Sequence, residues 1–224
     1  ICANAEILNS FVLAKAVNPN VPLIYASWAR TFDMRVAACC HGGPEFAMLR
    51  AATTQLAKFY GLPSSGGSTL SDSKSIDVQM GMEKMGTGLL PALARTNMLF
   101  GMGLLADENS MSLEALIIDS EIARWIERVL RGIDVSKATC ELGVFKEVGP
   151  GGNFVSCENT RNYYKVEQFI PTVMDRGYLA LDKDPMDKNI RKRAKALYPK
   201  LMKNFNKPEV SDAVVKRIDD IIAR

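Results

Sequence analysis

VPLIYAS at residues 21–27 and NMLFGMGLL at residues 97–105 decide the fold class of this 224-residue chain. Both are short, nearly continuous apolar runs, a pattern typical of strands buried within a sheet. Helical patterns precede, separate and follow them, so strands alternate with helices along the chain. This alternation predicts an α/β fold with a parallel sheet, either open or closed into a barrel.

The helices are predicted from apolar residues at helical spacing and from turn signals. Pro44 stands at the first position of one helix, and Glu45 suits its positive dipole end. We expect helices over residues 3–17, 44–59, 76–95, 112–131, about 137–148 and about 160–169, the last capped by Thr160, and two more opened by Asp184-Pro185 and Pro208. Residues 64–74, SSGGSTLSDSK, lack periodicity and are interpreted as a loop.

The composition excludes several classes of protein. A net charge of +3 is too small to indicate nucleic-acid binding, and the five scattered cysteines favour reduced thiols and a cytoplasmic location. No apolar run approaches the roughly 18 residues that cross a bilayer, so no membrane contact is expected. The sequence opens inside a helical pattern without an initiator Met, which predicts that the chain starts partway through its fold.

Phosphate and metal motifs are weak in this sequence. Neither glycine loop, residues 64–74 or 149–152, has the spacing of a nucleotide-binding motif. Cys39-Cys40-His41 resembles a metal site at first sight, but adjacent cysteines rarely chelate one zinc ion and the chain has a single histidine. We therefore expect no metal, and interpret these residues as structural.

A dense polar cluster begins at Asp72. The run Asp72-Ser73-Lys74-Ser75-Ile76-Asp77 and Gln79 places carboxylates, an ammonium, hydroxyls and an amide at a loop-to-helix junction. Loops after strands hold the active site in parallel α/β folds, so we predict Asp72, Lys74, Asp77 and Gln79 as catalytic residues, with Lys74 paired to Asp72 or Asp77. The alternative is helix capping by Ser73 or Ser75, with Asp77 in the first turn.

Several segments, in order along the chain, resemble one enzyme family. They are Asp33-Met34-Arg35, Gly43-Pro44-Glu45, Gln55-Leu56-Ala57 with Phe59-Tyr60-Gly61-Leu62-Pro63, Asp72-Ser73-Lys74, Asp119 with Glu121, Gly149-Pro150-Gly151-Gly152-Asn153-Phe154 and Asp175-Arg176. Together they are similar to the trimethylamine:corrinoid methyltransferase family. The resemblance implies a TIM (β/α)8 barrel of roughly twice this length, of which residues 1–224 would be the carboxy-terminal part and residues 184–224 a helical extension.

The resemblance also implies an activity. A methyl group would move from trimethylamine to the cobalt of a separate corrinoid protein, so that the corrinoid comes from a partner and no cofactor is bound directly. A cationic amine needs carboxylates or aromatic faces, which Asp72, Asp77 and Glu83 on one side and Tyr25, Trp28 and Phe100 on the other would supply. Core packing is the alternative for the aromatic residues. We also expect a homo-oligomer.

The substrate depends on the branch of the family. The methanogenic trimethylamine branch carries pyrrolysine, encoded by an in-frame amber codon, whose place we expect within residues 66–71 near Leu70; the sequence contains none. A pyrrolysine-free member would act on glycine betaine or another quaternary amine, and a non-catalytic fragment is a further alternative. The family often has histidine at the positions of Asn153 and Asn159, so no histidine role is carried over to them.

Overall fold

A computed structural model describes residues 1–178, 189–203, 205–206 and 209–223. Its helices are α1 (Cys2–Val17), α2 (Pro44–Phe59), α3 (Val78–Leu93), α4 (Leu113–Arg131), α5 (Leu142–Val148), a 3-10 turn η1 (Phe154–Ser156), α6 (Glu158–Glu167), α7 (Ile190–Lys203) and α8 (Asp212–Ile222). Its strands are β1 (Tyr25–Ala26), β2 (Thr31–Asp33), β3 (Ala38–Cys40), β4 (Ser64–Gly67), β5 (Met98–Phe100), β6 (Leu104–Leu105) and β7 (Ser110–Met111). The predicted α/β class is confirmed.

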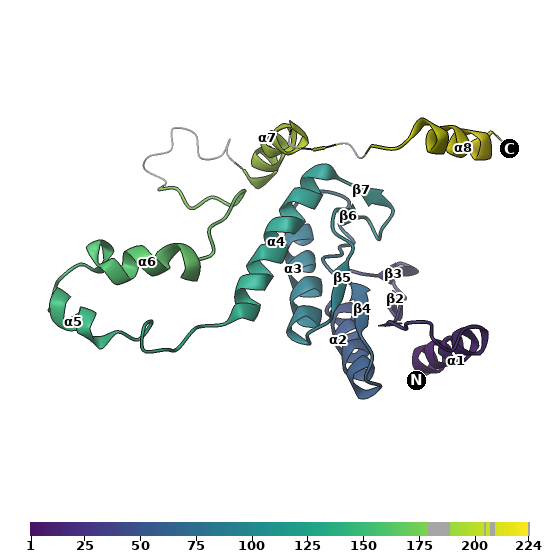
Figure 1. The fold of residues 1–224 in the computed structure, drawn as a ribbon, viewed down its shortest axis with the longest axis horizontal. Helices are drawn as coiled ribbons and strands as arrows, with labels where there is room; N and C mark the ends of the chain where they lie inside the picture. Colours follow the sequence, from purple (N-terminus) through teal and green to yellow (C-terminus); the bar gives the residue numbers. More distant parts are fainter. Residues whose placement is uncertain (179–188, 204, 207–208, 224) are drawn as a thin grey trace.

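A three-stranded parallel sheet in the order β1-β4-β5 organises the molecule (Figure 1). Tyr25 pairs with Ser64, and Gly67 pairs with Phe100. The two apolar stretches that predicted the sheet therefore run parallel to each other, on either side of β4. Two short antiparallel hairpins, β2-β3 and β6-β7, follow β1 and β5. The described residues form no closed barrel.

The burial predicted for the stretch at residues 97–105 is confirmed at Leu105, which lies in the core, and is wrong for most of β5. Gly101 and Gly103 have positive φ and break the stretch into β5 and β6. Within β5, Leu99 packs against the helical core, whereas Met98 is 50% exposed and Phe100 is 37% exposed. Helices α2, α3 and α4 lie together beside the sheet (Figure 1), so the apolar side chains of its other face remain accessible.

The central strand, β4, was predicted to be a loop. Its four residues, SSGG, are all buried and pair with strands on both sides. A Cβ atom on Gly66 would lie 3.3 Å from the Arg50 side chain, and one on Gly67 would lie 3.0 Å from that of Leu70. Small residues are needed here because large side chains approach the backbone closely, so the strand lacks the β-branched residues on which sequence patterns depend.

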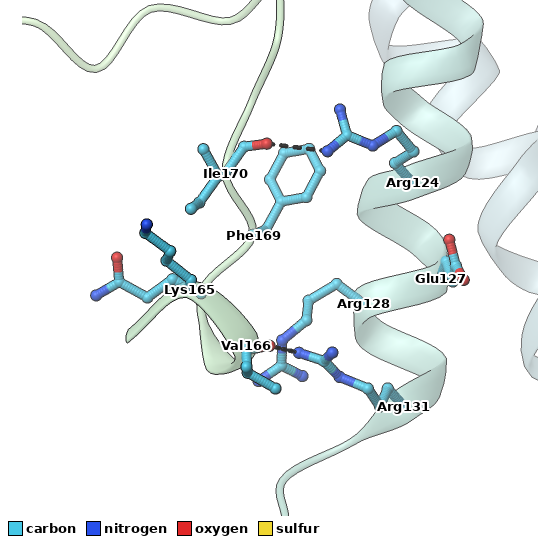
Figure 2. Close-up of a pocket in the computed structure, with 9 residues that line it drawn as sticks. Arg124, Glu127, Arg128, Arg131, Lys165, Val166, Phe169 and Ile170 are labelled. Atoms are coloured by element: carbon cyan, nitrogen blue, oxygen red, sulfur yellow. Dashed lines mark hydrogen bonds between the residues drawn. The ribbon is translucent and has the colours of Figure 1, made fainter. Parts of the chain in front are cut away.

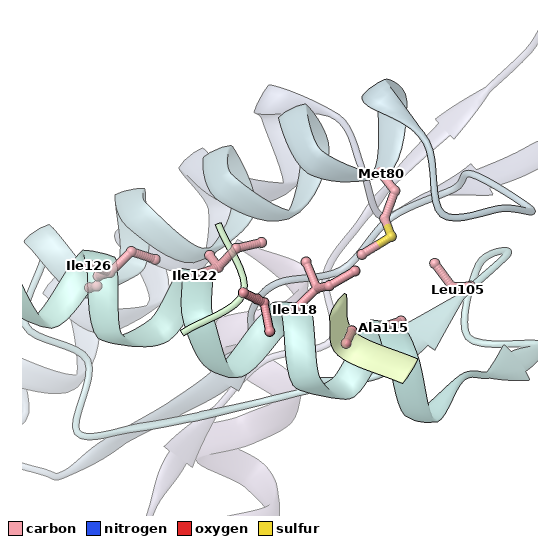
Figure 3. Packing of buried hydrophobic residues seen from close by; sticks show 9 residues of the cluster. Met80, Leu105, Ala115, Ile118, Ile122 and Ile126 are labelled. Carbon is pink, nitrogen blue, oxygen red and sulfur yellow. The ribbon is translucent and has the colours of Figure 1, made fainter. Parts of the chain in front are cut away.

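The hydrophobic core lies between α3, α4 and α7. Ile118, Ile122 and Ile126 follow one another along the buried side of α4, and Met80 of α3 lies at the Ile118 end of this row, as Figure 3 shows. Ala194 of α7 is fully buried against the same cluster. The 19-residue α4 is capped at its start by Ser112, whose side chain accepts a hydrogen bond from the Ala115 N–H, and at its end by Gly132 with φ +72°. This core fixes the helices behind the sheet.

Several predicted helix ends differ from the structure. Asp77, and neither Ser73 nor Ser75, caps α3 by accepting a hydrogen bond of 2.9 Å from the Met80 N–H. Helix α6 starts at Glu158, so Thr160 lies inside its first turn rather than at its cap. Asp184, Pro185 and Pro208 lie outside the described residues.

The outer helices make few contacts with the sheet. None of the residues of α1, α5, α6 or α8 is buried, whereas α7 packs on α4. In Figure 1, α8 lies apart from the sheet and its helices. Among the described residues, every helix is too short or too polar to cross a membrane.

Candidate functional site

The site is built around the loop that follows β4 at the carboxyl end of the sheet. Residues 68–71 of this loop are buried, and Thr69 takes the left-handed conformation with φ +50°. Thr87 of α3 accepts a hydrogen bond of 3.0 Å from the Leu70 N–H, and Lys84 donates one of 2.9 Å to the Thr69 carbonyl. The loop is therefore fixed by α3 immediately beyond the strand end, where ligands bind in parallel α/β folds.

A buried ion pair supports this loop from behind. Lys84 Nζ lies 2.6 Å from Asp119 Oδ2, and both side chains are inaccessible to solvent. The same carboxylate oxygen accepts a 2.6 Å hydrogen bond from the Gly103 N–H, which ties the segment after β5 to the same point. Burial lowers the pKa of Lys84 and raises that of Asp119, and their mutual attraction offsets part of both effects.

Asp72 joins this loop to the turn before α2. Its carboxylate accepts hydrogen bonds from the backbone N–H of His41 at 2.9 Å and of Gly42 at 3.1 Å, and from the Cys40 thiol at 3.2 Å. Burial raises the pKa of Cys40 to about 11, and the Asp72 carboxylate adds to that effect. Asp72 and Lys74 both line a cavity of about 350 Å³ beside these residues.

The other residues predicted as catalytic are spread over the surface of the same junction. Asp77 is exposed and serves as the cap of α3, which keeps its pKa below the ordinary value through hydrogen bonds from the Met80 N–H and the Ser75 hydroxyl. Gln79 is also exposed and donates to Glu83 at 2.7 Å. Neither lines the cavity that Asp72 and Lys74 share. Lys74 forms no ion pair within the described part of the chain, contrary to the predicted pairing.

Glu83, predicted as a carboxylate for the amine, is partly buried and hydrogen-bonds to the loop after β4. Its Oε2 accepts hydrogen bonds from the Ser71 hydroxyl at 2.7 Å and from the Asp72 N–H at 2.9 Å. Gly42 packs directly against the Glu83 side chain. A Cβ atom on this glycine would lie only 2.4 Å from the Glu83 carboxyl group. Glu83 therefore holds Asp72 in place, and the two carboxylates belong to one network.

Two aromatic residues meet on the open face of the sheet. Trp28 follows β1 and Phe100 ends β5, and their ring centroids lie 5.5 Å apart in an edge-to-face arrangement. Both are partly exposed, so a cation could reach their faces. Tyr25 belongs elsewhere: its buried ring stacks on Tyr60, and its hydroxyl donates to Asn4. Leu70 is buried close to Gly67 and Gly101, at the carboxyl ends of β4 and β5.

His41, interpreted from the sequence as a structural residue, lies at the candidate site. Its ring is fully buried, packs edge-to-face on Phe46 and contacts the Asp107 carboxylate through Nδ1. Its Nε2 lies 3.8 Å from Glu108 Oε2. Asp107 lies 66 residues from His41 in the sequence, so no local spacing signals this contact.

A second cavity, of about 400 Å³, lies far from the sheet between α4 and residues 165–170 (Figure 2). Arg124, Arg128 and Arg131 project from α4 toward this segment, and Lys165 lies opposite them. Arg124 donates to the Ile170 carbonyl, and Arg128 donates to the Glu167 carbonyl. This cationic lining disfavours an amine cation, and the arginines hold the segment on α4.

Comparisons with known proteins agree on one family. The family model described as trimethylamine methyltransferase matches residues 1–224. The chain is 34% identical over 223 residues to glycine betaine methyltransferase of Desulfitobacterium hafniense strain Y51, covering 99% of the chain and 46% of that relative. It is 40% identical over 158 residues to trimethylamine methyltransferase MttB of Methanosarcina thermophila, covering 70% of the chain and 33% of that relative.

A third relative has another substrate in its name. The chain is 31% identical over 210 residues to L-carnitine:corrinoid methyltransferase of Eubacterium limosum, covering 92% of the chain and 43% of that relative. The chain thus spans less than half the length of the curated relatives it matches. The match of the family model to all 224 residues, together with these relatives, shows that this chain belongs to the trimethylamine methyltransferase family.

Proposed function

We propose that this chain supplies the carboxy-terminal part of a TIM (β/α)8 barrel that transfers a methyl group from trimethylamine to the cobalt of a separate corrinoid protein. The observation that carries the proposal is the family match over residues 1–224. Three parallel strands joined through α2 and α3 are in keeping with consecutive strand–helix units of such a barrel. The name of the carnitine relative supports a corrinoid partner.

In this reaction the protein does not have to supply the nucleophile. Co(I) is a strong nucleophile, so the Co–C bond forms as the C–N bond breaks; nitrogen keeps the bonding pair, and cobalt becomes Co(III). The protein has to hold the amine in line with the cobalt. Trimethylamine is protonated at neutral pH, and the faces of Trp28 and Phe100 suit such a cation. Asp72, held by Glu83 and the turn at His41, gives the neighbouring surface a negative charge.

A second substrate is favoured by one observation. No pyrrolysine stands between residues 66 and 71, and a glycine betaine methyltransferase is among the relatives that match nearly the whole chain. In a quaternary amine the leaving group is a neutral tertiary amine, which needs no assistance. The same aromatic pair suits a quaternary ammonium.

The test uses the complete enzyme with its reduced corrinoid protein. The absorption spectrum should change from that of Co(I) to that of methyl-Co(III) when trimethylamine is added. Conversion with glycine betaine but not with trimethylamine would place the enzyme in the quaternary-amine branch. If neither amine causes conversion, the proposed activity is wrong. Sequencing the codons for residues 66–71 independently identifies the branch, because an amber codon there indicates pyrrolysine.

A further inference from the structure

We infer that His41, Asp72 and Asp107 form a binding site for one divalent transition-metal cation such as Zn²⁺ or Mn²⁺. One ring nitrogen of His41 and one carboxylate oxygen from each aspartate lie within 4.8 Å of one another. Ligand atoms bound to one ion at about 2.1 Å lie up to about 4.2 Å apart, so a small side-chain adjustment brings all three onto it. One imidazole with two carboxylates is a donor set that suits such ions.

The buried imidazole points independently to a ligand. The His41 side chain is 1% exposed, and its Nε2 has no hydrogen-bond partner among the described atoms. A buried nitrogen without a partner is unfavourable, and an ion on Nδ1 would make Nε2 a donor aimed at Glu108. A metal-bound histidine usually has its second nitrogen directed at a carboxylate. With Nδ1 on the ion beside Asp107, Nε2 faces Glu108 at 3.8 Å in that position.

The charge around the site also favours a cation. Asp72, Asp107 and Glu108 gather around one imidazole, and none of them forms an ion pair with a Lys or Arg side chain in the described part of the structure. The cavity of about 350 Å³ that Asp72 and Asp107 line gives an ion and its water ligands access from solvent. Three protein ligands would leave positions for water.

The ion would join three segments that are distant in the sequence. His41 precedes α2, Asp72 lies in the loop after β4, and Asp107 lies in the β6-β7 hairpin. All three segments surround the carboxyl end of the sheet, so the ion would fix the loops that shape the proposed substrate site. This inference concerns binding alone and does not require methyl transfer.

The experiment measures metal binding by the 224-residue chain and by the complete enzyme. We expect Zn²⁺ or Mn²⁺ titrated into the chelator-treated protein to bind with a stoichiometry of one, and Co²⁺ to produce the visible absorption of a bound ion. His41→Gln, Asp72→Asn and Asp107→Asn should each weaken binding by more than about tenfold, because even outer partners of metal ligands contribute that much. Asp33→Asn is the matched control, since Asp33 lines the same cavity outside the cluster.

Folding is followed in parallel by circular dichroism, with Asp107→Asn as the most informative variant because its loop is partly exposed. A folded wild-type chain that binds none of the three ions would overturn the inference. Binding that persists in all three ligand variants, or that Asp33→Asn reduces equally, would also overturn it. Because no amine or corrinoid is present, these outcomes leave the proposed methyl transfer untouched.

Discussion

At the residue scale, the acidic side chains of the candidate site have two different roles. Asp77 is exposed and caps α3, whereas Asp72 is half-buried and holds the turn at His41 through two backbone hydrogen bonds. Both stand in the polar run that the sequence singled out, five residues apart. Only their contacts distinguish a cap from a residue that shapes the site.

Two substitutions separate these roles. Asp72→Asn keeps the size of the side chain but removes the charge, and we expect methyl transfer by the complete enzyme to fall roughly tenfold, equivalent to about 1.4 kcal/mol of transition-state stabilisation. Asp77→Ser retains a capping oxygen and should leave the rate close to wild type. Rates are measured from the formation of methyl-Co(III). Equal losses in both variants would contradict this division.

The Lys84–Asp119 pair offers a test of stability. Lys84→Met leaves Asp119 buried without its partner, so we expect the free energy of unfolding to fall by about 3–5 kcal/mol. The double variant Lys84→Met/Asp119→Leu should lose less, because it removes the unpaired charge as well. Urea denaturation measures both, with the exposed Lys146→Met as control. A loss below about 1 kcal/mol in the single variant would show that the pair is not needed.

At the element scale, Glu121 attaches the segment around residue 173 to α4. Its buried carboxylate accepts hydrogen bonds from the backbone N–H groups of Thr172 at 2.7 Å, Val173 at 2.9 Å and Met174 at 3.2 Å. Burial alone would raise the pKa of Glu121, but these bonds and the Thr172 hydroxyl outweigh it and hold the pKa below 4.5. Val173 is thereby placed in the hydrophobic core.

This shift predicts how stability depends on pH. The folded-state pKa lies below the unfolded value, so the contribution of Glu121 is present above pH 4.5 and is lost as the pH falls through the lower folded value. Glu121→Gln should lower the free energy of unfolding by about 2 kcal/mol at neutral pH. It should also make the free energy of unfolding fall less steeply as the solution is acidified. Denaturation from neutral pH to about pH 3 measures this. Glu127→Gln, at an exposed position of the same helix, should match wild type.

At the scale of the whole molecule, the sheet presents one accessible apolar face. Trp28 and Met98 are about half exposed, at 49% and 50%, and Phe100 is exposed to 37%. Grouped exposure of this kind is uncommon for a monomer and marks a surface that another part or molecule covers. The expected homo-oligomer and the proposed barrel would each provide such a cover.

We therefore expect the 224-residue chain to self-associate as its concentration rises. Light scattering coupled to size-exclusion chromatography gives the mass directly. Met98→Lys should reduce association, since it places a charge on the apolar face. Val155→Lys is the control, because Val155 is 78% exposed on η1, away from the sheet. A chain that stays monomeric at every concentration would contradict the prediction.

Sequence patterns located most of the helices and the parallel pairing. Helix α2 starts at Pro44 and ends at Phe59 as predicted, because proline, glycine and apolar spacing are local signals. The family, too, followed from short motifs in order. Strand β4 was missed because its SSGG sequence carries no strand signal, and its structure depends on hydrogen bonds to β1 and β5 and on the close approach of α2.

The site divides in the same way. The short spacing of Asp72, Lys74, Asp77 and Gln79 along the chain was enough to place all four at one loop-to-helix junction. Which of them lie inside depends on contacts with distant segments: Asp72 turns toward His41 and Glu83, while Asp77 and Gln79 face solvent. It also joined His41 to Asp107, across 66 residues, since long-range contacts depend on how strands and helices pack and leave no periodicity in the sequence.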